Sequence, residues 1–200
     1  MSEDPGSTSL NVQVVVRDGA WGRSWPDRRV ALEHAAKLAY TRGTYLRGTG
    51  AQGTYAQGTY ARPAGAADLA IVLADDGFLR ELNRTYRGQD AATNVLAFEG
   101  SDPVDPNPID PIPEEAWQLG DVVLARETIA REASAQAKRF ADHAVHLTVH
   151  GVLHLLGHDH GTDAEARQME ALEIEILEVL GIADPYGEVS EMPTAASEAR

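Results

Sequence analysis

The sequence predicts an α+β domain, in which a small mixed four-stranded sheet is packed with about five helices. Two kinds of segment carry this prediction. Short runs rich in β-branched and apolar residues are typical of strands, and longer segments have apolar residues at helical spacing. Along the chain they follow the order β-α-β-α-β-β-α-α-α, as expected for helices packed on one small sheet.

The first half of the chain supplies two strands and two helices. Residues 11–17 (NVQVVVR) are β-branched and apolar and predict a strand. After a Trp-rich turn, residues 27–40 carry apolar side chains at roughly helical spacing and predict a helix. Residues 68–74 (DLAIVLA) predict the second strand, and Asp75 is placed to cap a helix over 76–86.

The second half supplies two more strands and the central helix. Residues 93–98 (TNVLAF) and 119–126 (LGDVVLAR) predict strands, and residues 127–139 predict a helix. Residues 142–156 predict a further helix, whose apolar stripe indicates that it is central and buried. Gly157 is placed to end this helix in a left-handed turn.

A last helix follows Thr162 and Glu165, which have the spacing of a capping box, and Gly181 is placed to end it. One face carries residues expected to be buried: Met169, Leu172, Ile176 and Leu180. The opposite face carries acidic residues expected to be exposed: Glu170, Glu173 and Glu178.

The chain is expected to hold a single domain over residues 11–186, with disordered tails over 1–10 and 187–200. Two segments interrupt the regular pattern. Residues 42–66 contain three near-copies of a Gly-Thr-Tyr tetrapeptide, and their glycines predict a flexible insertion. Residues 101–115 are rich in proline and aspartate and predict a loop.

The composition excludes several classes of protein. The chain has no cysteine, so disulfides and thiolate metal sites are excluded, and any metal must be held by nitrogen or oxygen. No stretch approaches the ~20 apolar residues of a membrane span, and the polar N-terminus lacks the features of a secretory signal. A cytoplasmic protein without a membrane partner is expected. The net charge of −14 argues against broad nucleic-acid binding, and no DNA partner is expected.

Six of the seven histidines lie between His143 and His160. His150 and His154 are four residues apart on the central helix, so their rings project from one face. The turn at Gly157 lets His160 supply a third nitrogen. This pattern predicts one zinc ion per chain on the central helix, with the fourth tetrahedral position open to water, as in catalytic zinc sites.

Neighbouring residues have predicted roles around this site. His146 and Asp159 are candidates for groups that hydrogen-bond or orient the ligand imidazoles. His158 is expected to be structural. In a metalloprotease helix of the His-Glu-x-x-His type, a glutamate base follows the first histidine, but here Gly151 has that place.

Two arginines offer a second functional element in an otherwise acidic chain. Arg84 and Arg87 lie near the end of the helix predicted over 76–86. A guanidinium beside a metal-bound water could hold a phosphate through two oxygens. The residues alone support equally the reading that these arginines only complement the helix dipole.

Three motifs resemble the YbeY endoribonuclease family. Residues 150–160 (HGVLHLLGHDH) resemble its histidine signature, residues 82–98 (LNRTYRGQDAATNVLAF) its second motif, and residues 119–121 (LGD) its third. The resemblance covers about residues 12–186 and lapses in the Gly-Thr-Tyr insertion. His158 stands where many members of the family have tyrosine.

The resemblance implies a zinc-dependent, single-strand-specific endoribonuclease. It implies a role in ribosomal RNA processing, notably 3′-end maturation of the small-subunit 16S RNA, and in ribosome quality control. It assigns zinc ligation to His150, His154 and His160 and a functional role to Arg87. The expected partners are single-stranded ribosomal RNA and the ribosome or small-subunit assembly proteins, because the acidic chain should bind free RNA weakly.

Two alternatives stay open. The same helix could serve another zinc hydrolase, such as a peptidase or amidase, although the missing glutamate counts against that reading. The chain could also be a noncatalytic ribosome-assembly factor with a structural zinc. Loss of activity with an intact fold after replacement of His154 would favour catalysis, whereas unfolding would favour the structural role.

Overall fold

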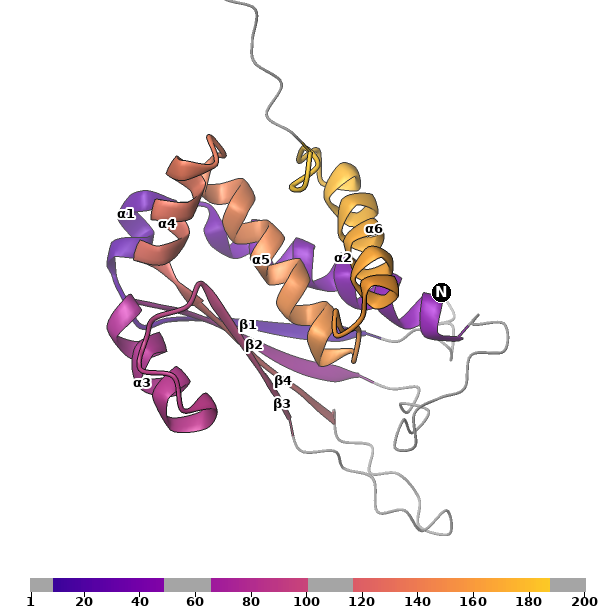
Figure 1. Cartoon of the computed structure of the whole chain (residues 1–200), viewed down its shortest axis with the longest axis horizontal. Helices are drawn as coiled ribbons and strands as arrows, with labels where there is room; N and C mark the ends of the chain where they lie inside the picture. Colours follow the sequence, from indigo (N-terminus) through magenta and orange to yellow (C-terminus); the bar gives the residue numbers. More distant parts are fainter. Residues whose placement is uncertain (1–8, 49–65, 101–116, 188–200) are drawn as a thin grey trace, which may run out of the picture.

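The computed structural model describes residues 9–48, 66–100 and 117–187, and they form one mixed sheet covered by helices on both faces (Figure 1). The strands are β1 (Leu10–Val16), β2 (Ala67–Ala74), β3 (Val95–Glu99) and β4 (Trp117–Ala125). Their order in the sheet is β1-β2-β4-β3. β1, β2 and β4 are parallel, whereas β3 pairs antiparallel with β4 and forms an edge. The predicted mixed four-stranded sheet is confirmed.

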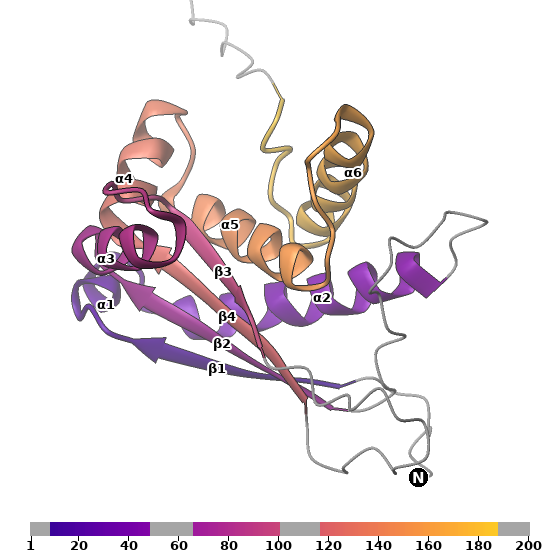
Figure 2. The ribbon, with the colours of Figure 1, turned by 60° about the horizontal axis from the view of Figure 1, so that its bottom comes forward.

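Six helices lie in the described ranges: α1 (Ala20–Ser24), α2 (Arg28–Gly48), α3 (Asp76–Arg87), α4 (Arg126–Ala135), α5 (Phe140–Leu155) and α6 (Asp163–Val179). Helices α2, α4, α5 and α6 build the larger core on one face of the sheet, and α3 covers the other (Figure 2). None of these helices is long and apolar enough to cross a membrane. The predicted order of elements is confirmed, with α1 as an addition.

Helix α1 lies in what the sequence suggested was only a turn. Its Trp21 is fully buried, and the indole Nε1–H donates a hydrogen bond of 2.9 Å to the carbonyl oxygen of Ala74 at the end of β2. A buried indole needs such a partner. This anchor fixes the connection between β1 and α2 against the sheet.

Helix α2 runs further than predicted, because the first Gly-Thr-Tyr copy belongs to it. Gly43 is helical and lies against α5: a Cβ built there would be 2.5 Å from Leu156 Cδ1 and 3.0 Å from Leu153 Cδ2. This glycine therefore permits close helix packing, and the expectation that it belongs to a flexible insertion was wrong. The other two copies and the loop over 101–115 lie outside the described residues.

The two tails lie largely outside the described residues as well. Leu10, which was assigned to the N-terminal tail, is buried in the first strand. At the other end, the described chain continues past α6 through Tyr186. The single-domain assignment over 11–186 stays a prediction.

Helix α5 is the central helix that the sequence predicted. It packs against the sheet and against α2, α4 and α6, and most of its residues are buried. Gly151 brings it close to β4, because a Cβ at this position would be 2.8 Å from Val122 Cγ1. The helix that carries His150 and His154 is therefore held in place by the sheet and by three other helices.

Several predicted helix boundaries are confirmed. Asp75 caps α3 by accepting a hydrogen bond from the backbone N–H of Phe78, and Thr162 and Glu165 form the capping box of α6. Gly157 has φ +76°, in the left-handed region expected after α5. This last turn decides where the chain goes after the helix, and with it the position of His160.

Candidate metal centre

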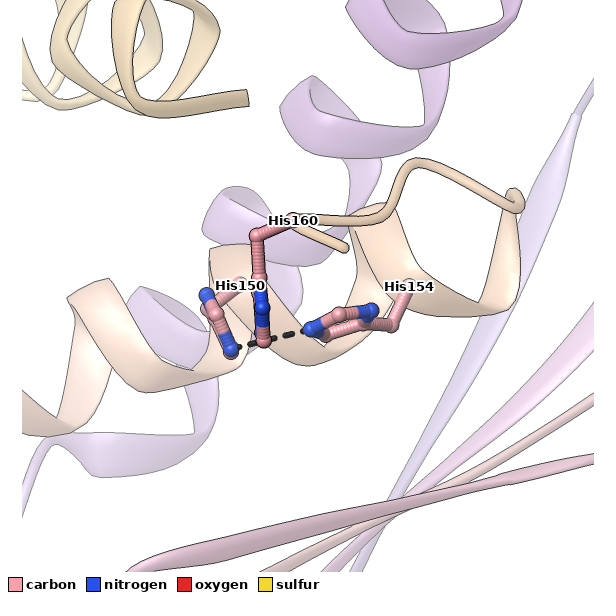
Figure 3. A group of neighbouring side chains, drawn as sticks. All are labelled: His150, His154 and His160. Atoms are coloured by element: carbon pink, nitrogen blue, oxygen red, sulfur yellow. Dashed lines mark hydrogen bonds between the residues drawn. The ribbon is translucent and has the colours of Figure 1, made fainter. Parts of the chain in front are cut away.

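Three imidazoles converge at the C-terminal end of α5. His150 and His154 project from the same side of the helix, and His160 returns from the following loop to face them (Figure 3). One ring nitrogen from each residue lies within 4.8 Å of the other two. His150 Nε2 and His154 Nε2 are 3.1 Å apart. The structure thus brings together the three residues predicted to be ligands.

The loop that carries His160 is held by backbone geometry. The N–H of Gly157 donates to the carbonyl oxygen of His154 at 2.7 Å, and the N–H of His158 donates to that of Leu153 at 3.0 Å. The His158 ring lies 3.1 Å from the carbonyl oxygen of Gly43, which links the loop to α2. Local turn chemistry and packing against α2 thus direct His160 back toward the helix.

Asp159 makes a different contact from the one expected. Its carboxylate accepts a 2.8 Å hydrogen bond from the backbone N–H of His160. Among the described residues it has no hydrogen bond to a ligand imidazole. The carboxylate that contacts a ligand ring comes instead from α6.

Glu173 of α6 is the residue that sequence reasoning placed wrongly. It was expected to be exposed, yet its exposed fraction is 0%. Its Oε1 accepts from His150 Nδ1 at 2.8 Å, and its Oε2 accepts from His146 Nε2 at 2.6 Å and from the Tyr186 hydroxyl at 2.5 Å. These three donors compensate the burial of the charge. A signal was present, because position 173 follows Met169 by four residues on the buried face of the helix.

Electrostatics around the site favour neutral imidazole and ionised carboxylate. Burial, together with His150 and His160, lowers the pKa of His154 to about 4, so the ring is neutral at neutral pH. Burial opposes the charged form of Glu173, but hydrogen bonds from His146 and His150 outweigh it and hold the carboxyl pKa well below its usual range. Metal ligands of the imidazole type must be neutral, so the state of His154 suits this role.

The donor set fits a divalent metal ion. Two ligands bound at 2.0–2.1 Å in tetrahedral geometry are separated by about 3.3 Å, close to the 3.1 Å between His150 Nε2 and His154 Nε2. Because Glu173 is an acceptor only, His150 must donate from Nδ1, which leaves the Nε2 lone pair directed toward His154. Nitrogen donors of this kind suit zinc and other first-row transition metals.

The triad opens into a cavity of about 560 Å³. Its walls come from α5, from the loop after α5, from edge strand β3 and from the end of α3, which contributes Arg87. Arg84 is exposed on α3 and does not line this cavity. The structure therefore brings Arg87, but not Arg84, to the same cavity as the three histidines.

A second carboxylate network, which is only partly buried, reaches the cavity from α4. Asn94 lines the cavity, and its Nδ2 donates to both oxygens of Glu132 at 3.0 and 3.2 Å. Glu132 also accepts from His143 Nε2 at 2.8 Å. Asn94 was not singled out from the sequence. Its position just before a strand gave no signal of a link to a helix nearly 40 residues further along.

Comparison with known proteins relates this chain to a family model, to curated relatives and to a solved structure. The family model described as Endoribonuclease YbeY matches residues 52–181. A protein of this name from Parvibaculum lavamentivorans is 57% identical over 182 residues, covering 90% of this chain and 86% of its own length. A second, from Paramagnetospirillum magneticum, is 56% identical over 126 residues, covering 63% and 75%. The solution structure of TM1509 from Thermotoga maritima aligns at a TM-score of 0.44 and 16% identity, over 88% of this chain and 99% of its own.

Proposed function

This chain belongs to the YbeY endoribonuclease family, and we propose that it is a zinc-dependent endoribonuclease that cleaves single-stranded RNA during ribosomal RNA maturation. The observation that carries the proposal is the shared cavity, whose walls include both the three convergent histidines and Arg87. Family membership supplies the substrate class, and the cavity supplies a chemistry suited to a phosphodiester.

Each group in the cavity has a defined task in this proposal. His150, His154 and His160 hold the metal, which when bound supplies a Lewis acid and an ionisable water. The Arg87 guanidinium would bind two phosphate oxygens and offset the negative charge on the phosphoryl oxygens in the transition state. Zinc is favoured because three imidazole ligands with an open fourth position are one of its usual catalytic sets.

The charge of the chain bears on how the RNA arrives. The cavity wall includes the acidic residues Glu99 and Asp159, and the chain carries a net charge of −14. Few phosphates can be neutralised by such a surface, so affinity for free RNA should be weak and should depend on the few cations near the cavity. We therefore propose that the ribosome or a small-subunit assembly protein recruits the enzyme, which places it in the cytoplasm. The proposed RNA target is the 3′ end of the small-subunit 16S RNA, together with RNA handled in ribosome quality control.

The test is cleavage of a labelled single-stranded RNA by the zinc-loaded wild type, by Arg87→Ala and by Arg84→Ala. Arg87→Ala should lower the rate roughly 10²–10³-fold, as expected for loss of one group that stabilises transition-state charge. Arg84→Ala is the matched control and should stay within a few-fold of the wild type, since Arg84 does not line the cavity. Metal content and circular dichroism are measured on the same samples.

Two outcomes would contradict the proposal. If Arg87→Ala cleaves as fast as the wild type, Arg87 does not hold the scissile phosphate. If the metal-loaded wild type is inert on every single-stranded RNA, the noncatalytic assembly factor becomes the better interpretation. The peptidase alternative has weaker support, because the position of its glutamate base is Gly151, where a side chain would meet Val122 of the sheet.

A further inference from the structure

The buried carboxylate of Glu173 connects α5, α6 and the segment after α6. All three of its hydrogen-bond donors are side chains, and one of them, His150, belongs to the metal-binding triad. Isolated carboxylates are among the costliest groups to bury, so helix α6 would be simpler to pack with an apolar residue at this position. Because Glu173 contacts the ring of a predicted metal ligand, His150, we expect it to have a role in the metal site.

Hydrogen-bond chemistry fixes the protons in this network. An ionised carboxylate has no hydrogen to donate, so His150 Nδ1, His146 Nε2 and the Tyr186 hydroxyl must each donate to it. A neutral His150 that donates from Nδ1 has a lone pair on Nε2. That nitrogen is the one lying 3.1 Å from His154 Nε2.

Tyr186 completes the enclosure of the carboxylate. Its ring packs edge-on against His146, with centroids 5.6 Å apart at an angle of 86°. The segment that carries it is tied to the connection between α4 and α5, where Lys138 Nζ donates to the carbonyl oxygen of Pro185 at 2.6 Å. The chain after α6 is thereby held over Glu173.

We propose that Glu173 is a positioning residue for the metal centre: it locks His150 in the tautomer whose Nε2 lone pair faces the metal, and Tyr186 keeps the carboxylate in place. The inference rests on the metal site of the proposed function but not on its RNA substrate. Such outer partners of ligand histidines fix ring orientation and raise ligand basicity. The hydrogen bond from His150 Nδ1 to Glu173 is therefore as much a part of the site as His150 Nε2.

The first test measures zinc affinity by competition with a chelating indicator. Glu173→Gln keeps the size of the side chain, but the amide NH₂ that replaces one carboxylate oxygen cannot accept a hydrogen bond from an imidazole N–H. One of the two histidines must therefore change tautomer or lose its hydrogen-bond partner. Zinc binding should weaken by about 10–100-fold. Tyr186→Phe removes one donor and should weaken it by only a few-fold.

Glu132→Gln is the matched control. Glu132 also accepts from a histidine of α5, but that histidine, His143, is not in the triad. Zinc affinity of Glu132→Gln should stay within about threefold of the wild type, since no ligand ring loses a partner. Equal weakening in both variants would mean that any loss of an α5 contact loosens the site, and it would overturn a specific role for Glu173.

A second measurement does not depend on whether Glu173→Gln folds. In the metal-free wild type at pH 8, the ¹⁵N shifts and couplings of His150 should show Nδ1 protonated and Nε2 bare. A bare Nδ1 would overturn the proposal, as would a folded Glu173→Gln protein that binds zinc within threefold of the wild type. Neither readout involves RNA, so failure of the proposed nuclease activity would leave this test intact.

Discussion

Both ends of helix α5 carry histidines, but the histidines at the two ends have different neighbours. At its N-terminal end, His143 and His146 are buried, and each is bonded to a carboxylate from a neighbouring helix. At its C-terminal end, His154 is bonded to no carboxylate in the described part of the chain, and its ring faces two other imidazoles. His150 lies between them and belongs to both groups, with a carboxylate on Nδ1 and the triad on Nε2.

Neutral charge does not distinguish the two ends. Burial lowers the pKa of His143 even though Glu132 acts in the opposite direction, and burial with two imidazole neighbours lowers the pKa of His154 to about 4. The two ends differ in what the ring nitrogens of their histidines contact. A histidine whose outward nitrogen already donates to a carboxylate is held in place, whereas ring nitrogens that converge on one another can hold a metal ion.

The largest expected effect comes from removing a histidine at the C-terminal end. His154→Ala takes one of three ligands from the site, so zinc affinity should fall by more than the roughly 100-fold limit typical of outer-partner mutations. The metal-free protein should keep its fold, because the His154 ring is only partly buried. Indicator competition gives the affinity, and urea unfolding of the metal-free protein gives the stability.

His143→Ala is the counterpart at the other end and should show the reverse pattern. It leaves Glu132 without one donor and opens a cavity under α4, so unfolding free energy should fall by about 1–3 kcal/mol. Zinc affinity of the folded protein should change little. If His143→Ala loses zinc while His154→Ala unfolds, the two ends have been assigned the wrong way round.

The sequence predicted the C-terminal end of α5 better than its surroundings. Spacings of four and six residues around a glycine turn are local, so the convergence of His150, His154 and His160 could be predicted from helix spacing and the turn at Gly157. The order of strands and helices was equally accessible, because hydrophobic periodicity is a local signal.

The partners of these histidines were not predicted, because they come from distant segments. Glu173 lies 23 residues beyond His150, and its acidic side chain was expected to be exposed although its position lies on the buried face of its helix. Gly43 was interpreted from composition as a flexible residue, since nothing nearby in sequence shows that Leu153 and Leu156 pack on it. Burial of a polar group or of a glycine depends on which elements meet in the tertiary structure.

A smaller effect is expected where the middle of α5 rests on the sheet. In Gly151→Ala the new methyl group would lie 2.8 Å from Val122 Cγ1 and 3.0 Å from its Cγ2, and a valine side chain cannot easily move aside. Overpacking costs about 1–3 kcal/mol, and the better helix propensity of alanine returns about 1 kcal/mol. A net loss of about 1 kcal/mol is expected in urea unfolding.

The same variant shows whether the sheet sets the position of the triad. A shift of α5 away from β4 would displace His150 relative to His160, since these residues lie on different segments. Zinc affinity should therefore fall by a few-fold in Gly151→Ala. An alanine that raises stability and leaves zinc affinity unchanged would show that α5 is free to settle on β4 without disturbing the site.

The smallest expected effect is a pH dependence from the N-terminal end. Because burial depresses the folded-state pKa of His143 below its ordinary value of about 6.5, folding favours the neutral ring. This contribution is fully present above pH 6.5 and is lost as the pH falls through the lower, folded-state pKa. Protonation of the metal-free wild type below pH 6.5 should therefore lower its unfolding free energy, and His143 contributes to that fall.

His143→Gln removes that titration and leaves the other histidines of the network in place. Glu132, His146 and Lys138 act on the His143 ring in the wild type, and all three remain in the variant. Between pH 7 and pH 5 the stability of His143→Gln should fall less steeply than that of the wild type, while His34→Gln, at an exposed position, should track the wild type. A wild type that falls less steeply than His143→Gln would mean that Glu132 holds a charged His143 in an ion pair, and parallel curves for all three proteins would mean that folding does not shift the pKa of His143; either result would contradict the neutral hydrogen bond.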